Sequence, residues 1–287
     1  MLTVHEINSI AVCGAGTMGA GIAQVTASAG FYTILFDLKP DILDKARAQI
    51  QKSLQQQVEK GRLAQPDADA ALGRIRFTTD AHDCIAEVII EAIVEKVAAK
   101  AALFNQLAEL NHSEAVFASN TSSLSLSTIA KAIQHPSRVA GLHFFNPAPA
   151  MKLVEVVSGE QTAAWVSELL YQLAQQLGKT PVRVKDAPGF IVNRVARHFY
   201  LEAMQLAGNN NTSFKTIDTL LEAVGFRMGP FALMDLIGND INLAVSTSLY
   251  EAFDKAPRFE PGKLQQHLVA EGNLGRKTGK GFYNYNK

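Results

Sequence analysis

The sequence predicts an α/β protein whose doubly wound, mostly parallel sheet precedes an all-helical domain. Short apolar stretches of strand length alternate with helical stretches through the first part of the chain, which is typical of a parallel sheet with crossover helices. From Asp186 onward strand patterns nearly vanish and helical periodicity continues to the end. We therefore predict an α/β domain over residues 1–185 and a helical domain over residues 186–287.

The composition limits the classes of function. The 287 residues are 47% hydrophobic and 19% charged, and 27 basic residues balance 27 acidic ones, so nothing in the net charge favours a nucleic acid or a membrane as partner. Cys13 and Cys84 lack the spacing of metal ligands, so we expect two free thiols and no metal site. The N-terminus has no basic leader and no apolar run reaches membrane-spanning length, which favours a cytoplasmic protein.

The strongest local motif is a glycine loop between a strand and a helix. The apolar stretch Ile10–Cys13 is followed by Gly14, Gly16 and Gly19, then by a helical stretch to Ala29 and a second strand, Tyr32–Phe36. This arrangement is the dinucleotide-binding fingerprint, in which the helix N-terminus faces the pyrophosphate. The residues expected to contact the cofactor are Gly14, Gly16, Thr17, Met18 and Gly19.

An acidic residue sets the expected cofactor. Asp37 ends the second strand, where its carboxylate would bind the adenine ribose hydroxyls and repel a 2′-phosphate. NAD is therefore favoured over NADP. A plain structural turn is the alternative reading of the glycine loop.

The next stretches extend the sheet and add a long helical excursion. Helical patterns cover 41–61 and 66–72, and further strands are expected at 75–78, 88–92, 115–118 and 180–184, with helices at 96–110 and 163–177. Ligands of doubly wound sheets lie outside the carboxyl ends of the strands. The polar run from Asn120 to Ser123 follows one such strand end, so it is a candidate part of the site.

A proline-containing turn predicts a hairpin within the segment 141–157. The prolines place the turn between Asn146 and Ala150, so His143 and Glu155 lie equally far from its tip and face one another on paired strands. An imidazole held by a carboxylate suits proton transfer, but it also suits a structural hydrogen bond, and the local sequence does not decide between them. The position of His143 at the ligand edge favours catalysis.

Helices are expected in the second domain at 191–205, 217–224 and 231–250, the last interrupted at Gly238. A turn is expected at 208–213, with Ser213 as the N-cap of the following helix. Asn193 opens the first of these helices and either projects into a substrate cleft or merely caps the helix.

Several motifs in this order resemble one known family, the L-3-hydroxyacyl-CoA dehydrogenases, over essentially the whole chain. They are the glycine loop, Glu91–Glu95, Ser119–Ser123, Gly141–Val157, Pro188–Arg194, Met228–Pro230 and Leu274–Tyr283. The resemblance implies a Rossmann-like domain that binds NAD and a C-terminal helical domain that binds substrate and forms a homodimer. It also implies an acyl-CoA substrate.

The resemblance assigns roles to matching positions. His143 would be the general base, oriented by Glu155, and Ser122 and Asn193 would bind the substrate oxygen at C3. Further NAD contacts would come from Glu95, Lys100, Asn120, Ser122, Asn146 and Lys277 beside Asp37. Ser53 and Lys60 match positions that meet the CoA moiety.

The second half is similar to the branch of phenylacetate degradation, which oxidises 3-hydroxyadipyl-CoA, whereas other members act on 3-hydroxybutyryl-CoA in fatty acid metabolism. The segment 235–240, Arg258-Phe259 and Gln265-Gln266 carry this similarity. Arg227 departs from the proline usual in the family and leaves the substrate end open. The alternatives are a dehydrogenase of a free hydroxy acid such as gulonate, or a catalytically silent NAD-binding structural protein.

Overall fold

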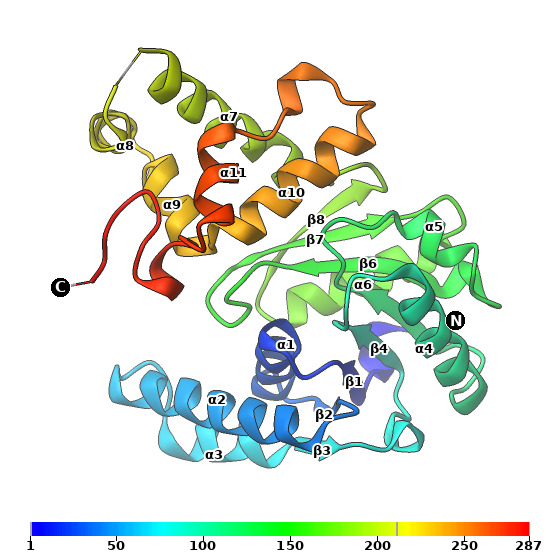
Figure 1. The fold of residues 1–287 in the computed structure, drawn as a ribbon. Helices are drawn as coiled ribbons and strands as arrows, with labels where there is room; N and C mark the ends of the chain where they lie inside the picture. Colours follow the sequence, from blue (N-terminus) through cyan, green and yellow to red (C-terminus); the bar gives the residue numbers. More distant parts are fainter. Residues whose placement is uncertain (1, 211, 287) are drawn as a thin grey trace. The chain divides into compact units, whose positions relative to one another are not determined.

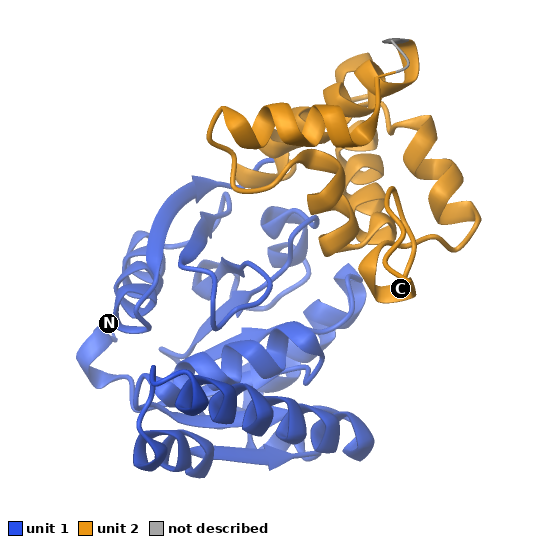
Figure 2. Ribbon diagram, turned by 90° about the vertical axis from the view of Figure 1, so that its left-hand side faces the viewer, with its two compact units in different colours: residues 1–187 blue, residues 188–287 orange. Residues whose placement is uncertain are grey.

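A computed structural model describes residues 2–210 and 212–286 of the chain. The chain divides into two compact units, residues 1–187 and 188–287, shown in different colours in Figure 2.

The first unit is built on one eight-stranded sheet in the order β3-β2-β1-β4-β5-β6-β7-β8 (Figure 1). Every neighbouring pair is parallel except β6 and β7, which run antiparallel. The strands are β1 Ser9–Cys13, β2 Tyr32–Phe36, β3 Ile75–Thr78, β4 Val88–Glu91, β5 Val116–Ser119, β6 Val139–Phe144, β7 Leu153–Ser158 and β8 Thr180–Lys185. The predicted fold class, mostly parallel with an antiparallel end, is confirmed.

Helices connect these strands, and most of them were expected from the sequence. They are α1 Thr17–Ser28, α2 Pro40–Glu59, α3 Gln65–Gly73, α4 Val97–Leu110, α5 Leu126–Ala130 and α6 Ala164–Gln176. The excursion forms the hairpin α2–α3, and α2 buries Leu43, Ala46, Ile50 and Leu54, which recur at helical spacing on one face. The five-residue α5 was not predicted, because so short a helix has too few residues to show a period.

Two thiols distant in sequence meet inside the first unit. Cys13 and Cys84 are both buried and free, and a hydrogen bond joins their side chains. This contact and burial together raise the pKa of the Cys13 thiol well above its usual value. The Cys13 sulfur therefore stays protonated, and both buried side chains pack as small apolar groups.

The second unit is helical. Its helices are α7 Val192–Asn210, α8 Phe214–Ala223, α9 Pro230–Ile237, α10 Asn239–Ala252 and α11 Lys263–Ala270. Gly238, at a φ of 105°, separates α9 from α10, as predicted, and the Ser213 hydroxyl caps α8 by accepting from the Thr216 amide. Helix α7 runs beyond the expected Gln205 into the predicted turn at 208–213, of which Asn211 lies outside the described residues.

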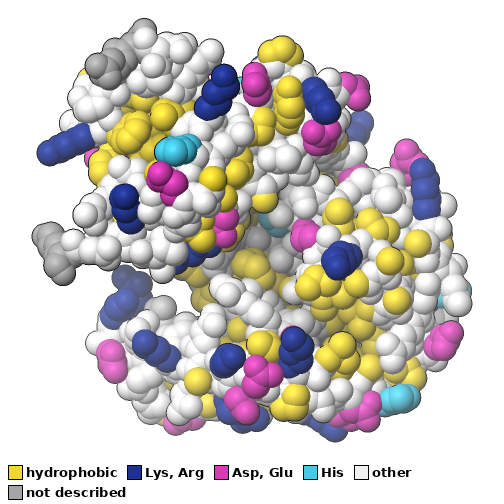
Figure 3. Space-filling model, viewed as in Figure 1, with side chains coloured by type: hydrophobic (Ala, Val, Ile, Leu, Met, Phe, Trp, Pro, Cys, Tyr) yellow, Lys and Arg dark blue, Asp and Glu magenta, His cyan; other side chains and the backbone are white. Residues whose placement is uncertain are grey.

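The surface carries both signs of charge. On the face in Figure 3, basic and acidic side chains are interspersed, in keeping with 27 residues of each kind. Among the described residues, no helix is both long and apolar enough to cross a lipid bilayer.

Candidate active site

The glycine loop has the backbone geometry that a dinucleotide needs. Gly14 has a φ of 99°, and a Cβ there would lie 2.6 Å from the Ala92 carbonyl oxygen. A Cβ on Gly19 would lie 1.7 Å from the Gly14 oxygen, so strand and helix pack too closely for any side chain. A Cβ on Gly16, by contrast, would meet no atom within 4 Å. The loop is therefore closed on its protein side and open where a pyrophosphate would approach.

Helix α1 begins immediately after this opening. Gly16 is its N-cap, and Thr17, Met18 and Gly19 form the first turn. The amides of a first helical turn have no acceptor within the helix, and the helix dipole adds partial positive charge there. These residues suit an anionic pyrophosphate, and Thr17, Met18 and Gly19 are expected to donate to it.

Asp37 stands at the carboxyl end of β2 and holds the loop. Its carboxylate accepts hydrogen bonds from the Ala15 amide at 2.8 Å and from the Lys39 amide at 3.0 Å. The negative charge is thus fixed beside the glycine loop, where the ribose of a bound NAD would lie.

We expect Asp37→Ser to narrow the preference for NAD over NADP. The shorter neutral side chain no longer repels a 2′-phosphate and no longer offers the ribose hydroxyls a charged acceptor. The ratio of the affinities for NAD and NADP should therefore fall roughly 10- to 100-fold. Calorimetric titration with each cofactor measures the ratio of Kd values. Asp41→Ser, in an exposed acid at the start of α2, is the matched control; an equal change in both variants would contradict the assignment.

The hairpin β6–β7 pairs His143 with Glu155 in register, as the sequence predicted. His143 Nδ1 lies 2.8 Å from Glu155 Oε2, and the two side chains are 7% and 1% exposed. The Phe145 ring packs on the imidazole at 4.5 Å between centroids. A buried carboxylate that contacts Nδ1 fixes the ring orientation, and Nε2 is the other nitrogen through which such a ring can exchange a proton.

A buried cluster of charges fixes the polar segment 119–123. The Lys100 ammonium, 1% exposed, lies 2.6 Å from Glu91 Oε1 and 3.0 Å from Glu95 Oε2. Glu91 accepts from the Ser119 hydroxyl at 2.7 Å. Glu95 accepts from the Thr121 hydroxyl at 2.9 Å and the Ser122 amide at 3.0 Å. The cluster therefore ties the ends of β4 and β5 together.

The charge of Glu95 is maintained despite partial burial. Burial raises the pKa of this carboxyl, but the Lys100 ammonium and the hydrogen bonds from Ser122 and Thr121 outweigh burial and lower the pKa below its usual value. Glu95 and Lys100 were predicted to contact NAD. In this structure they pair with each other, and any cofactor contact stays a prediction.

Two further predicted cofactor residues lie beside the hairpin. The Asn120 side-chain oxygen accepts from the Phe144 amide at 2.8 Å, next to His143 in β6. Asn146 is exposed in the turn after β6. Lys179 holds the same turn by donating to the carbonyls of Ala148 at 2.6 Å and Met151 at 2.9 Å, a role that the sequence did not reveal.

The remaining predicted residues lie farther along the chain. Ser53 is half-buried in α2 and Lys60 is exposed at its C-cap, seven residues or two turns later, so both lie on one side of the helix. In the helical unit, Asn193 lies in the first turn of α7, and Lys277 Nζ lies 2.6 and 2.7 Å from the two carboxylate oxygens of Asp240. Their cofactor and substrate roles stay predictions.

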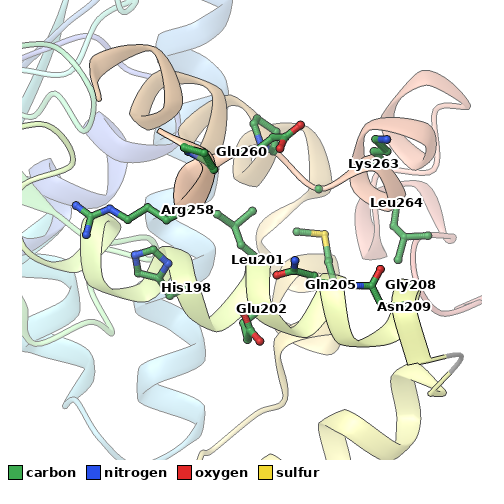
Figure 4. A pocket seen from close by; sticks show the side chains of 14 residues that line it. His198, Leu201, Glu202, Gln205, Gly208, Asn209, Arg258, Glu260, Lys263 and Leu264 are labelled. Carbon is green, nitrogen blue, oxygen red and sulfur yellow. The ribbon is translucent and has the colours of Figure 1, made fainter. Parts of the chain in front are cut away.

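The helical unit also contains a cavity of about 760 Å³ between α7 and the segment 257–264 (Figure 4). Its lining includes His198, Leu201, Gln205 and Arg258. None of the predicted catalytic or cofactor residues lines this cavity, so it is not the candidate active site.

Together, the glycine loop, Asp37 and the buried His143–Glu155 pair have the arrangement expected of an α/β dinucleotide-binding protein of the NAD-dependent dehydrogenase class. Residues 9–187 match the 3-hydroxyacyl-CoA dehydrogenase NAD binding domain, and residues 189–285 match the C-terminal domain of the same enzymes. The chain belongs to the 3-hydroxyacyl-CoA dehydrogenase family. The predicted family, oxidoreductase class and NAD-binding domain are confirmed.

Relatives and solved structures agree with this family. The chain is 47% identical over 98% of its length to 3-hydroxyadipyl-CoA dehydrogenase of Escherichia coli, of which it covers 59%. It is 40% identical over 97% of its length to the mitochondrial hydroxyacyl-coenzyme A dehydrogenase of Sus scrofa, covering 91% of that protein. The crystal structure of (S)-3-hydroxybutyryl-CoA dehydrogenase from Ralstonia eutropha superposes with a TM-score of 0.93 at 37% identity, covering 98% of this chain and all of that one. The chain thus spans about three fifths of the Escherichia coli relative.

Proposed function

We propose that this protein catalyses the reversible NAD-dependent oxidation of a (3S)-3-hydroxyacyl-CoA to the 3-oxoacyl-CoA. The observation that carries the proposal is the buried pair of His143 Nδ1 and Glu155 Oε2, 2.8 Å apart on the hairpin that ends the sheet. NAD, when bound, supplies the acceptor for the hydride that leaves C3.

The protein's part in this reaction is proton transfer and positioning. His143 Nε2 takes the proton of the C3 hydroxyl as the C–H bond breaks, so positive charge develops on the imidazole. The Glu155 carboxylate stabilises that charge and holds the ring in one orientation, which lowers the energy of the transition state more than that of the ground state. In the reverse direction the imidazolium returns the proton to the forming alcohol.

Two side chains are proposed to bind the oxygen at C3. The Ser122 amide donates a hydrogen bond to the Glu95 carboxylate, which fixes the backbone that carries the Ser122 hydroxyl. Asn193 lies in the first turn of α7, and its amide would donate to the same oxygen. Ser53 and Lys60 are proposed to meet the CoA moiety, the lysine by pairing with phosphate.

The names of the relatives guide our proposal for the acyl group of the substrate. One relative is named for 3-hydroxyadipyl-CoA and a solved neighbour for 3-hydroxybutyryl-CoA, so we propose a short acyl-CoA substrate of one of these two kinds. We also propose a role in phenylacetate catabolism or fatty acid metabolism, in the cytoplasm.

A panel of substrates tests the proposal. NADH formation measured with 3-hydroxybutyryl-CoA, 3-hydroxyadipyl-CoA and the free acids, gulonate included, separates the acyl-CoA reaction from its rival. Activity confined to a free acid would contradict the CoA assignment. A complete lack of NADH formation with every substrate would point to the silent structural protein.

We further propose a homodimer formed through the helical unit. Leu220, Val224 and Phe226, in and just after α8, are 61%, 74% and 51% exposed. Contiguous exposed apolar side chains of this kind commonly mark an interface.

Val224→Glu is expected to shift the protein toward the monomer, because a symmetric interface would bury the introduced charge twice. Size-exclusion chromatography with light scattering measures the mass at micromolar concentration. Ile85→Glu, at an apolar residue 50% exposed in the first unit, is the matched control. A wild-type protein that is monomeric throughout would contradict the dimer.

A further inference from the structure

A buried arginine in the helical unit has no acidic partner. Arg197 lies in α7 and is 2% exposed. Its Nη1 donates to the Asn242 carbonyl at 2.9 Å, the Asn242 side-chain oxygen at 3.0 Å and the Ser246 hydroxyl at 2.9 Å, all neutral acceptors on α10. No salt bridge to an acidic side chain forms at this guanidinium within the described part of the chain.

One edge of this guanidinium is unused. All three of its hydrogen bonds leave from Nη1, and the buried Nε has no acceptor. Through the edge formed by Nε and Nη2, an arginine can bind a carboxylate with two parallel hydrogen bonds. The charge is therefore held with one donor of this edge, the buried Nε, left without an acceptor.

The surrounding polar network orients Arg197 without neutralising it. Gln265 donates to the side-chain oxygens of Asn242 at 3.1 Å and Asn239 at 3.3 Å. Asn239 in turn donates to Asp235 at 2.8 Å. The carboxylate nearest along this network is thus separated from Arg197 by three amide side chains.

That carboxylate is already occupied by other donors. Asp235 also accepts from the amides of Phe282 and Tyr283, each at 2.9 Å, and from the Tyr285 hydroxyl at 3.1 Å. Burial, meanwhile, lowers the pKa of Arg197 to about 10, which still leaves the guanidinium charged at neutral pH. An uncompensated buried charge is costly, and a bound anion would offset that cost.

The position of Arg197 fits an anion on the substrate. It lies four residues after Asn193 on the same helix, which places the two on one face, about 6 Å apart along the axis. In a 3-hydroxyadipyl chain, three carbon–carbon bonds of about 1.5 Å separate C3 from the distal carboxyl carbon, and its oxygens reach farther. If Asn193 binds the oxygen at C3, a distal carboxylate lies within reach of the long arginine side chain.

We propose that Arg197 binds the distal carboxylate of a dicarboxylic 3-hydroxyacyl-CoA and so sets the preference for such substrates. The proposal rests on the proposed function of the protein and deepens it. Arg227, the unusual residue before Met228, is a weaker candidate because its side chain is exposed and its charge is already solvated.

The test compares two substrates of equal chain length, 3-hydroxyadipyl-CoA and 3-hydroxyhexanoyl-CoA, which differ by the terminal carboxylate. We expect the wild-type protein to prefer the dicarboxylic substrate in kcat/KM. Arg197→Met should lower the ratio of the two kcat/KM values roughly 10- to 100-fold, the effect of losing hydrogen bonds to a charged group. Arg227→Met is the control and should leave the ratio unchanged.

A second variant guards against misfolding of Arg197→Met. Asn242→Asp keeps the shape of the side chain and places a carboxylate against the Arg197 guanidinium, so it should also lower the ratio while the protein stays folded, as thermal unfolding would show. An unchanged ratio in Asn242→Asp, or a wild-type protein without dicarboxylate preference that still oxidises 3-hydroxyhexanoyl-CoA, overturns this inference and leaves the proposed function intact. Failure to oxidise either substrate would instead overturn the proposed function.

Discussion

His143→Gln is expected to lose turnover on the order of a hundred- to ten-thousandfold while NAD affinity stays near the wild-type value. Glutamine cannot take up the proton that leaves the C3 hydroxyl, so the base is lost. The glycine loop and Asp37, which follow β1 and β2, are untouched. Initial rates of NADH formation give kcat, and calorimetric titration gives the Kd for NAD. Near-normal turnover would remove His143 from the mechanism.

Glu155→Gln separates a catalytic pair from a structural one. The amide keeps the shape and can still hold the ring, but it no longer stabilises the imidazolium that develops during hydride transfer. We expect a smaller loss of kcat than in His143→Gln, with the Km for NAD unchanged. Turnover equal to that of the wild-type protein would make the 2.8 Å contact between the two side chains merely structural.

The hairpin was predictable because its signals are local. Pro147 and Pro149 exclude strand structure between Asn146 and Ala150, and the period of two then fixes His143 opposite Glu155 without knowledge of the rest of the fold. The glycine loop was predictable for the same reason, since strand, loop and helix follow one another directly.

The buried charges were not predictable, because their partners come from separate elements. Glu91 ends an apolar strand and was noted only as part of a family motif, and Lys100 reads as an ordinary helix residue. An acid at the carboxyl end of a fully buried strand is the signal that, in retrospect, demands a cation nearby. Arg197 gave no such signal, because a lone arginine in a helix is usually solvated.

The assembly of the helical unit was only partly predictable. Gly238 predicts the break between α9 and α10, because a glycine readily adopts the positive φ found there. The eight-residue α11 was missed, although its Gln265 is fully buried and joins the network of Asn239 and Asn242. Polar residues that are buried through tertiary hydrogen bonds contradict the apolar pattern on which helix prediction depends.

Lys100→Met is expected to destabilise the protein by about 3–5 kcal/mol, because it leaves the buried charge of Glu91 without its ammonium partner. For a unit of this size each kcal/mol lowers Tm by roughly 2–4 °C, so a loss of about 10 °C is expected. Thermal unfolding followed by circular dichroism measures it. Lys96→Met, at an exposed lysine beside α4, is the matched control and should change little.

The double variant Glu91→Gln with Lys100→Met distinguishes a role of Lys100 in stability from a role in NAD binding. Removing both buried charges should recover much of the lost stability, because neither ion is then left unpaired. If Lys100 instead acts through NAD alone, the single variant would weaken NAD binding without lowering Tm, and the second substitution would restore nothing. Since Lys100 also pairs with Glu95, which holds the Ser122 amide, we expect the single variant to lose both stability and turnover. Recovery of Tm without full recovery of turnover in the double variant would show that the cluster also positions the segment 119–123.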